Sequence, residues 1–160
     1  MKRIAIAFLL AAVPCFAQVA NEPTISADAA LDALNAALRQ CRADGQKVSV
    51  TVVDAAGRVK ASLRDDGAAP HTAEHSMRKA YTALSYKTPS AEYGKRAQEA
   101  KGVAIGPQLL PNITTAAGGV PIRVNDAVIG AIGVSGTPSS AGGGEHDAKC
   151  AAAGMAKLAK

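Results

Sequence analysis

The chain has 160 residues and a formal net charge of +5, with no Trp, two Phe and three Tyr. Both Phe residues lie within the first 17 positions, so the rest of the chain lacks most of the aromatic platforms on which single-stranded nucleic acid stacks. Two basic residues at positions 2 and 3 account for part of the charge, and without them it falls to +3. We therefore predict no nucleic-acid partner.

Residues 1–17 are typical of a secretory signal peptide. Two basic residues after Met1 precede an apolar stretch over residues 4–13, and Ala17 provides a small residue for cleavage. The apolar stretch is too short for a stable membrane anchor. We expect a single mature domain of residues 18–160 that is periplasmic or secreted.

The first helix is predicted between Ser26 and Gly45. Ser26 is a favourable N-cap, and Gly45 is typical of a residue that ends a helix. One helical face carries the apolar side chains that should enter the core, namely Leu31, Leu34, Leu38 and Cys41.

Two β-hairpins are predicted, at residues 48–63 and 118–136. The second turns at Asn125-Asp126 and places two glycines, Gly130 and Gly133, in its apolar second strand. A glycine inside a strand often marks the close approach of another group. We therefore interpret this strand as a candidate ligand surface.

Helices are predicted at residues 72–86, 89–100 and 145–159, the first of them capped by its initial Thr. Residues 101–117 are rich in Gly and Pro and predict an extended loop, with one short strand near Leu109. A loop of this length in a small domain is often functional. Two hairpins separated by helices indicate one α+β domain.

The mature chain retains two cysteines, Cys41 and Cys150. In an oxidising compartment a disulfide between them would join the two ends of the domain, whereas the alternative is two separate buried thiols. The sequence contains no Cys-x-x-Cys-His motif, which excludes covalent attachment of a c-type haem.

Four segments in this order resemble the GlcG/HbpS-type haem-binding family: residues 50–57, 78–83, 118–122 and 129–136. The resemblance covers about residues 26–158. It implies a profilin-like α+β sandwich, in which a five-stranded antiparallel sheet carries helices on both faces, and it implies homo-oligomers. It also implies binding of haem or a related tetrapyrrole, and haem degradation is proposed for some members.

A haem site needs apolar walls, an iron ligand, and cations or amides for the propionates. In residues 70–79, His71 lies just before the second helix and is our predicted axial ligand, with His75, one turn later, as second choice. Further predicted contacts are Arg78 and Lys79 with the propionates, Tyr81 with the porphyrin, and Gly118, Gly119 and Pro121 as a wall.

Each of these residues also has an ordinary structural interpretation. His71 would then be a loop residue and His75 a solvated helix residue. Arg78 and Lys79 would form a solvated face, and Tyr81 would belong to the core.

Residues 71–75 also match the H-x-x-E-H pattern of inverted zinc peptidases, in which Glu74 would act as the base. The motif lies at a helix start beside Pro70 rather than inside a helix, so a zinc-dependent hydrolase is the weaker hypothesis. The Gly142–Gly144 run lacks the Lys-Ser/Thr of a phosphate-binding loop.

The sequence thus favours an exported protein that binds haem or a related tetrapyrrole without covalent attachment, for storage, trafficking or sensing. The main alternative is a non-catalytic oligomeric scaffold, or a protein that binds another small ligand. The sequence assigns no catalytic residue and favours binding over turnover.

Overall fold

The structure is a computed structural model that describes residues 21–100 and 110–158. The predicted leader, its cleavage site and the strand expected near Leu109 lie outside these residues. The elements in chain order are α1 (Ala27–Ala43), β1 (Ser49–Asp54), β2 (Val59–Arg64), α2 (His71–Tyr86), α3 (Ser90–Glu99), β3 (Gly119–Val124), β4 (Ala127–Ser135), the 3-10 helix η1 (Ser139–Ala141) and α5 (Gly143–Leu158).

Both predicted hairpins are present and form one antiparallel sheet in the order β2-β1-β4-β3. The central strands β1 and β4 pair in register from Ser49 opposite Ser135 to Asp54 opposite Gly130. The prediction of five strands is wrong for the described residues, which form four. The described loop before β3 packs against α2 instead, where the amide of Thr114 donates to the hydroxyl of Thr82 at 2.9 Å.

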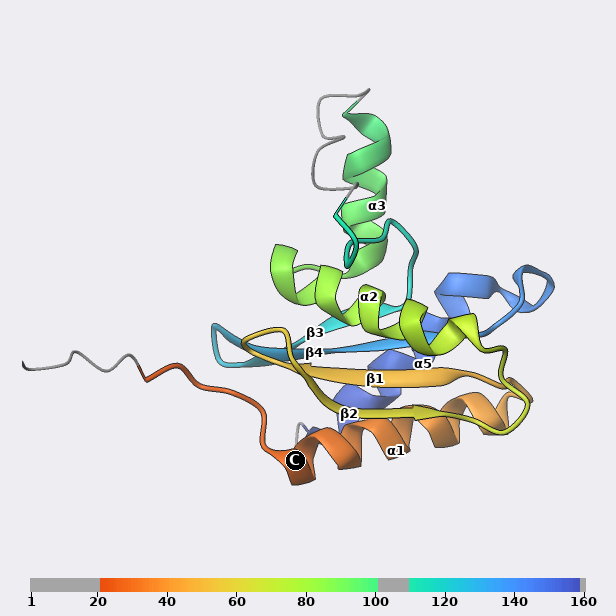
Figure 1. Cartoon of the computed structure of the whole chain (residues 1–160), viewed down its shortest axis with the longest axis horizontal. Coiled ribbons are helices and arrows are strands. Elements are labelled where there is room, and N and C mark those ends of the chain that lie inside the picture. Colours follow the sequence, from red (N-terminus) through yellow and green to blue (C-terminus); the bar gives the residue numbers. More distant parts are fainter. Residues whose placement is uncertain (1–20, 101–109, 159–160) are drawn as a thin grey trace, which may run out of the picture.

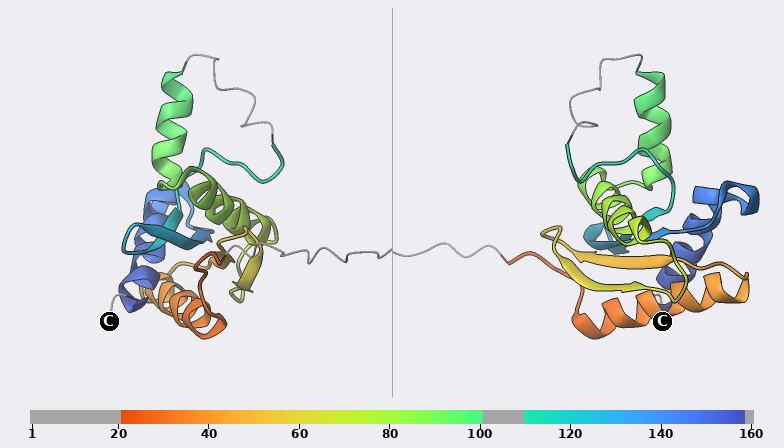
Figure 2. Two further views of the ribbon diagram at one scale, coloured as in Figure 1. Left: turned by 90° about the vertical axis from the view of Figure 1, so that its left-hand side faces the viewer. Right: turned by 45° about the vertical axis from the view of Figure 1, so that its right-hand side comes forward.

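Helices cover both faces of the sheet, as the α+β prediction required. Helix α2 lies on one face, and α1 and α5 lie together on the other (Figure 1). Helix α3 projects away from these layers, which is clearest when the molecule is turned (Figure 2). In the part of the chain that the structure describes, no helix has both the length and the hydropathy to cross a membrane.

Strand β1 is buried on both faces, and the two faces differ in chemistry. Val50 and Val52 belong to the larger apolar core shared with α1 and α5. The alternate residues face α2, where the hydroxyl of Ser49 lies 2.7 Å from that of Thr72 and the hydroxyl of Thr51 lies 2.8 Å from that of Ser76. Paired hydroxyls keep these buried polar groups satisfied.

The glycines of the second hairpin allow α2 to lie close to the sheet. A Cβ atom at Gly133 would overlap the carbonyl oxygen of Ser76, and one at Gly119 would overlap that of Lys79. A Cβ atom at Gly130 would meet the backbone of Val53 on the neighbouring strand. The interpretation of Gly130 and Gly133 as a ligand surface is therefore wrong, because protein backbone fills the space.

Helix α1 begins as predicted, with the hydroxyl of Ser26 accepting from the amide of Ala29 at 3.2 Å. Its buried stripe starts at Ala30, so Leu31, which we expected in the core, is 50% exposed.

Helix α2 starts one residue earlier than predicted, at His71. Thr72 is not its N-cap, because its hydroxyl donates to the carbonyl of Ala69 at 2.7 Å. Helix α5 starts two residues earlier than predicted, at Gly143.

The predicted disulfide between Cys41 and Cys150 is present, with a Cα–Cα distance of 5.6 Å. Both cysteines are fully buried, and 109 positions separate them in sequence. The bond fastens the end of α1 to the middle of α5.

Replacing both cysteines, as Cys41→Ala/Cys150→Ala, should lower the free energy of unfolding by about 2–5 kcal/mol, because the unfolded chain loses the constraint of a long closed loop. Urea unfolding followed by circular dichroism measures the loss. The wild type should lose similar stability in a reductant, and the double variant should not respond to it. A wild type insensitive to complete reduction would contradict the prediction.

Candidate functional site

A cavity of about 780 Å³ opens between the N-terminal turns of α2 and α5. The segment that follows β4 and the glycine run at the start of α5 form one side, and the first two turns of α2 form the other. Most of the wall consists of small side chains from Ala, Gly, Ser and Pro. The wall therefore leaves space for a ligand. Its ionisable groups come from both helices, with His71, His75 and Lys79 on α2 and with Glu145 and Asp147 on α5.

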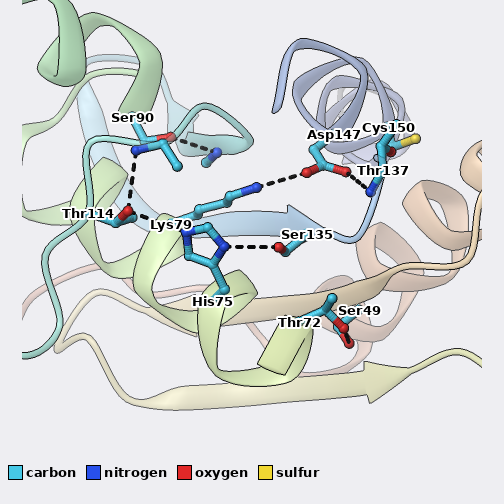
Figure 3. A network of polar contacts seen from close by, with 12 residues as sticks. Ser49, Thr72, His75, Lys79, Ser90, Thr114, Ser135, Thr137, Asp147 and Cys150 are labelled. Atoms are coloured by element: carbon cyan, nitrogen blue, oxygen red, sulfur yellow. Dashed lines mark hydrogen bonds and ion pairs between the residues drawn. The ribbon is translucent and has the colours of Figure 1, made fainter. Parts of the chain in front are cut away.

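A buried ion pair lies at the base of this cavity. The ammonium of Lys79 donates to Asp147 Oδ2 at 2.8 Å, and the two side chains are 3% and 2% exposed. Asp147 Oδ1 also accepts from the amide of Thr137 at 3.1 Å (Figure 3). Burial lowers the pKa of Lys79, and the attraction of Asp147 opposes that shift.

This pairing does not favour the predicted contact of Lys79 with a haem propionate. Its charge is compensated by Asp147, and its nitrogen lies beneath the surface. An incoming carboxylate would leave Asp147 as an uncompensated buried charge, which is costly.

His75 lies half-buried in the same cavity and is held at both ring nitrogens. Nδ1 lies 3.2 Å from the hydroxyl of Ser135, and Nε2 lies 3.3 Å from that of Thr114 (Figure 3). Burial lowers the pKa of His75, and the nearby ammonium of Lys79 lowers it further. The neutral ring would have to leave one hydroxyl before it could bind a metal.

His71 is the more accessible of the two predicted ligands. It is the first residue of α2, is exposed, and borders both the large cavity and a smaller one of about 240 Å³. Among the described residues its ring has no hydrogen-bond partner. Arg78 borders the smaller cavity too, where its guanidinium pairs with Glu74.

The other predicted contacts lie elsewhere. Tyr81 borders a separate cavity of about 530 Å³, near Gly57. Gly118 and Gly119 are buried against Lys79, and Pro121 is buried in β3 opposite Ala131. The structure thus brings together His71, His75 and Lys79 at the large cavity, while Arg78 borders the adjoining smaller one.

Sequence analysis missed the partners that hold this arrangement, which are Thr114, Ser135, Thr137 and Asp147. No local sequence pattern connects Asp147 with Lys79, because 68 positions separate them. The hydroxyl of Thr137 is buried and has no hydrogen-bond partner among the described residues. Thr137 also lines the cavity.

The H-x-x-E-H hypothesis gains no support from this geometry. Glu74 is exposed and pairs with Arg78. Within residues 21–100 and 110–158, the only cluster with three metal-binding side chains is Cys41, His146 and Cys150, away from this motif.

The model of the haem-degrading HbpS-like family matches residues 25–156. The chain belongs to this family. Protein GlcG of Escherichia coli K12 is 34% identical over 88 residues, which are 55% of this chain and 63% of GlcG. This chain therefore matches less than two thirds of the length of that relative.

Solved structures extend the likeness over the whole HbpS-like fold. A double mutant of HbpS from Streptomyces reticuli is 35% identical, with a TM-score of 0.82 over 94% of this chain and 99% of that one. A complex of PduOC with heme is 24% identical, with a TM-score of 0.75 over 85% of this chain and 96% of that one. The second likeness shows the shared fold alone.

Replacing Lys79 with Met in this HbpS-like chain should destabilise it by about 3–5 kcal/mol, because Asp147 would remain buried without its countercharge. The double variant Lys79→Met/Asp147→Asn should be more stable than the single one, since Asn can still accept from the amide of Thr137. Urea unfolding of the three proteins tests this. Equal stability of the single and double variants would show that the charge is not the cause.

Stability should also fall as the pH drops below about 6.5, because the folded state holds His75 with a pKa below its ordinary value. The unfolded chain then binds more protons than the folded one, so the contribution is complete above that pH and is lost as the pH falls through the folded pKa. Urea midpoints measured between pH 7.5 and 5 test the sign. His75→Asn should flatten this dependence, whereas His71→Asn should retain it.

Proposed function

We propose that this chain binds haem or a related tetrapyrrole non-covalently, with His71 as the iron ligand. The observation that carries the proposal is the position of His71, an exposed imidazole bordering a cavity of about 780 Å³ with walls of small residues. Membership of a family described as haem-degrading supports the ligand class. The PduOC complex supports the capacity of the fold to accommodate heme in that protein.

The residues present fit such a ligand in part. Imidazole is a common axial ligand of haem iron, and the Ala and Pro side chains of the wall suit an apolar ring. Arg78 borders the adjoining smaller cavity, has 38% of its side chain exposed, and could leave Glu74 to pair with a propionate. Bound haem would supply an iron centre that takes up ligands and changes oxidation state, while this chain's residues bind and orient it.

We further propose that the protein is exported, with residues 1–17 as its signal peptide, and acts in the periplasm or outside the cell in storage, trafficking or sensing. The Cys41–Cys150 disulfide supports an oxidising compartment. A homo-oligomer is also proposed. Its support is the edge strand β2, where Val59 and Leu63 are 55% and 43% exposed.

A hemin titration followed by absorbance tests the iron ligand. The protein obtained from the full chain should give a saturable, shifted Soret band, and His71→Ala should abolish the shift or weaken binding by tenfold or more. His146→Ala is a matched control, since the chain has three histidines and His146 does not border the cavity. The control should behave as the wild type.

If His75→Ala removes the shift while His71→Ala does not, the ligand is our second choice, His75. A weak, unsaturable response that is the same in all four proteins would overturn the proposal of haem binding.

A second candidate is a binder of a small polar ligand. It is favoured by the buried, unpartnered hydroxyl of Thr137 beside the cavity, a description that holds among residues 21–100 and 110–158. Such a ligand would need only part of the cavity and no metal ligand. This second function is preferred if the binding of hemin does not saturate.

A further inference from the structure

The contact between α1 and α5 carries four potential metal ligands, two from each helix. Cys41 lies on α1, and Asp44 is its C-cap residue three positions later. His146 and Cys150 are four positions apart on α5. Spacings of three and four residues place side chains on the same side of a helix, so both pairs face the same interface.

Three of these side chains already lie close enough together to bind one metal ion. The two sulfurs and a ring nitrogen of His146 all lie within 4.8 Å of each other. His146 Nε2 is buried and makes no hydrogen bond within the described part of the chain, although Asp44 Oδ2 lies 3.2 Å away. With metal–ligand bonds of roughly 2.0–2.2 Å, the nitrogen and oxygen ligands of a tetrahedral zinc ion lie about 3.4 Å apart. The observed separation is close to that value. The carboxylate of Asp44 lies outside the 4.8 Å cluster that the other three side chains form, so it would have to move toward the sulfurs to complete the site.

We propose that the reduced chain binds one Zn²⁺ through Cys41, Asp44, His146 and Cys150, and that zinc binding and the disulfide are mutually exclusive states. Two thiolates, an imidazole and a carboxylate are a donor set that zinc accepts in tetrahedral geometry. The inference does not rest on haem binding, since none of its four proposed ligands lines the large cavity.

A second disulfide, R–S–S–R, can act as the oxidant that converts the zinc-bound form into the disulfide-bonded form. The two zinc-bound thiolates transfer two electrons to R–S–S–R, the Cys41–Cys150 bond forms, and two RS⁻ leave. Zn²⁺ is released because only His146 and Asp44 remain. In the opposite direction, two thiols supply two electrons and two protons, and zinc displaces both protons from the cysteines.

Two groups oppose the metal at Asp44. The ammonium of Lys149 donates to Asp44 Oδ2 at 3.2 Å, and the amide of Gln40 donates to it at 3.0 Å. The side chain of Lys149 is 61% exposed and can turn into solvent.

The test is a zinc titration of the purified protein, reduced and then freed of reductant under anaerobic conditions, in competition with a chromogenic chelator. The reduced protein should bind one Zn²⁺ per chain, and the disulfide-bonded protein should bind at least tenfold more weakly. Co²⁺ should give the visible bands of a tetrahedral site and a sulfur-to-cobalt charge-transfer band in the reduced protein only.

Variants separate the proposed ligands from their surroundings. His146→Ala and Asp44→Asn should each weaken zinc binding by at least the roughly 10–100-fold that loss of an outer-sphere partner costs. Lys149→Ala should strengthen it, whereas Lys157→Ala, an exposed lysine near the end of the same helix, should leave it unchanged. His71→Ala should also leave it unchanged, which distinguishes this site from the proposed haem site.

Equal zinc binding in both redox states, or binding unaffected by His146→Ala, would overturn the proposal. If the reduced chain loses its fold without metal, zinc should restore its circular dichroism spectrum in the wild type but not in His146→Ala. A reduced chain that neither binds zinc nor regains its fold with it also overturns the proposal.

Discussion

The buried ion pair between Lys79 and Asp147 is the interaction on which the rest of the site depends. Lys79 belongs to α2 and Asp147 to α5, which cover opposite faces of the sheet (Figure 1). The pair joins these helices past the end of the sheet, where Gly118 leaves room for it. A Cβ atom at Gly118 would lie 3.0 Å from both Lys79 Cδ and Asp147 Cβ. Both walls of the large cavity are thereby fixed relative to each other.

Helix α5 is held by a second attachment one turn further along. Asp147 contacts α2, and Cys150, three residues later, forms the disulfide with α1. Near the end of α5, a Cβ atom at Gly154 would lie 2.6 Å from the carbonyl oxygen of Ala33, so the two helices approach closely. A chain with no Trp, and with no Phe after residue 17, thus achieves its packing with small residues, short helix separations and covalent and ionic links.

Sequence patterns predicted the elements well because their signals are local. Ser26 as a cap, the Asn125-Asp126 turn and the apolar faces of the helices depend on neighbouring residues only. The prediction that Leu31 is buried was wrong, because packing against α5 determines which side of α1 faces the core. The prediction that Gly130 and Gly133 form a ligand surface was wrong for a similar reason. A glycine in a strand indicates that another group lies close, but the sequence does not show whether that group is a ligand or protein backbone.

The candidate site shows the same division between local and long-range information. His71 and His75 are one helical turn apart, and their shared position on α2 follows from sequence. The difference in accessibility between the two histidines does not follow from the sequence. The hydroxyls that hold His75 come from Thr114 and Ser135, which lie 39 and 60 positions away. The consequence is chemical. Lys79 is compensated by Asp147 and His75 is engaged by hydroxyls, so the remaining ionisable groups of the large cavity are His71 and the exposed Glu145. Arg78 borders the adjoining smaller cavity. In the function that we propose, a tetrapyrrole would place its iron at His71 and its propionates toward Arg78.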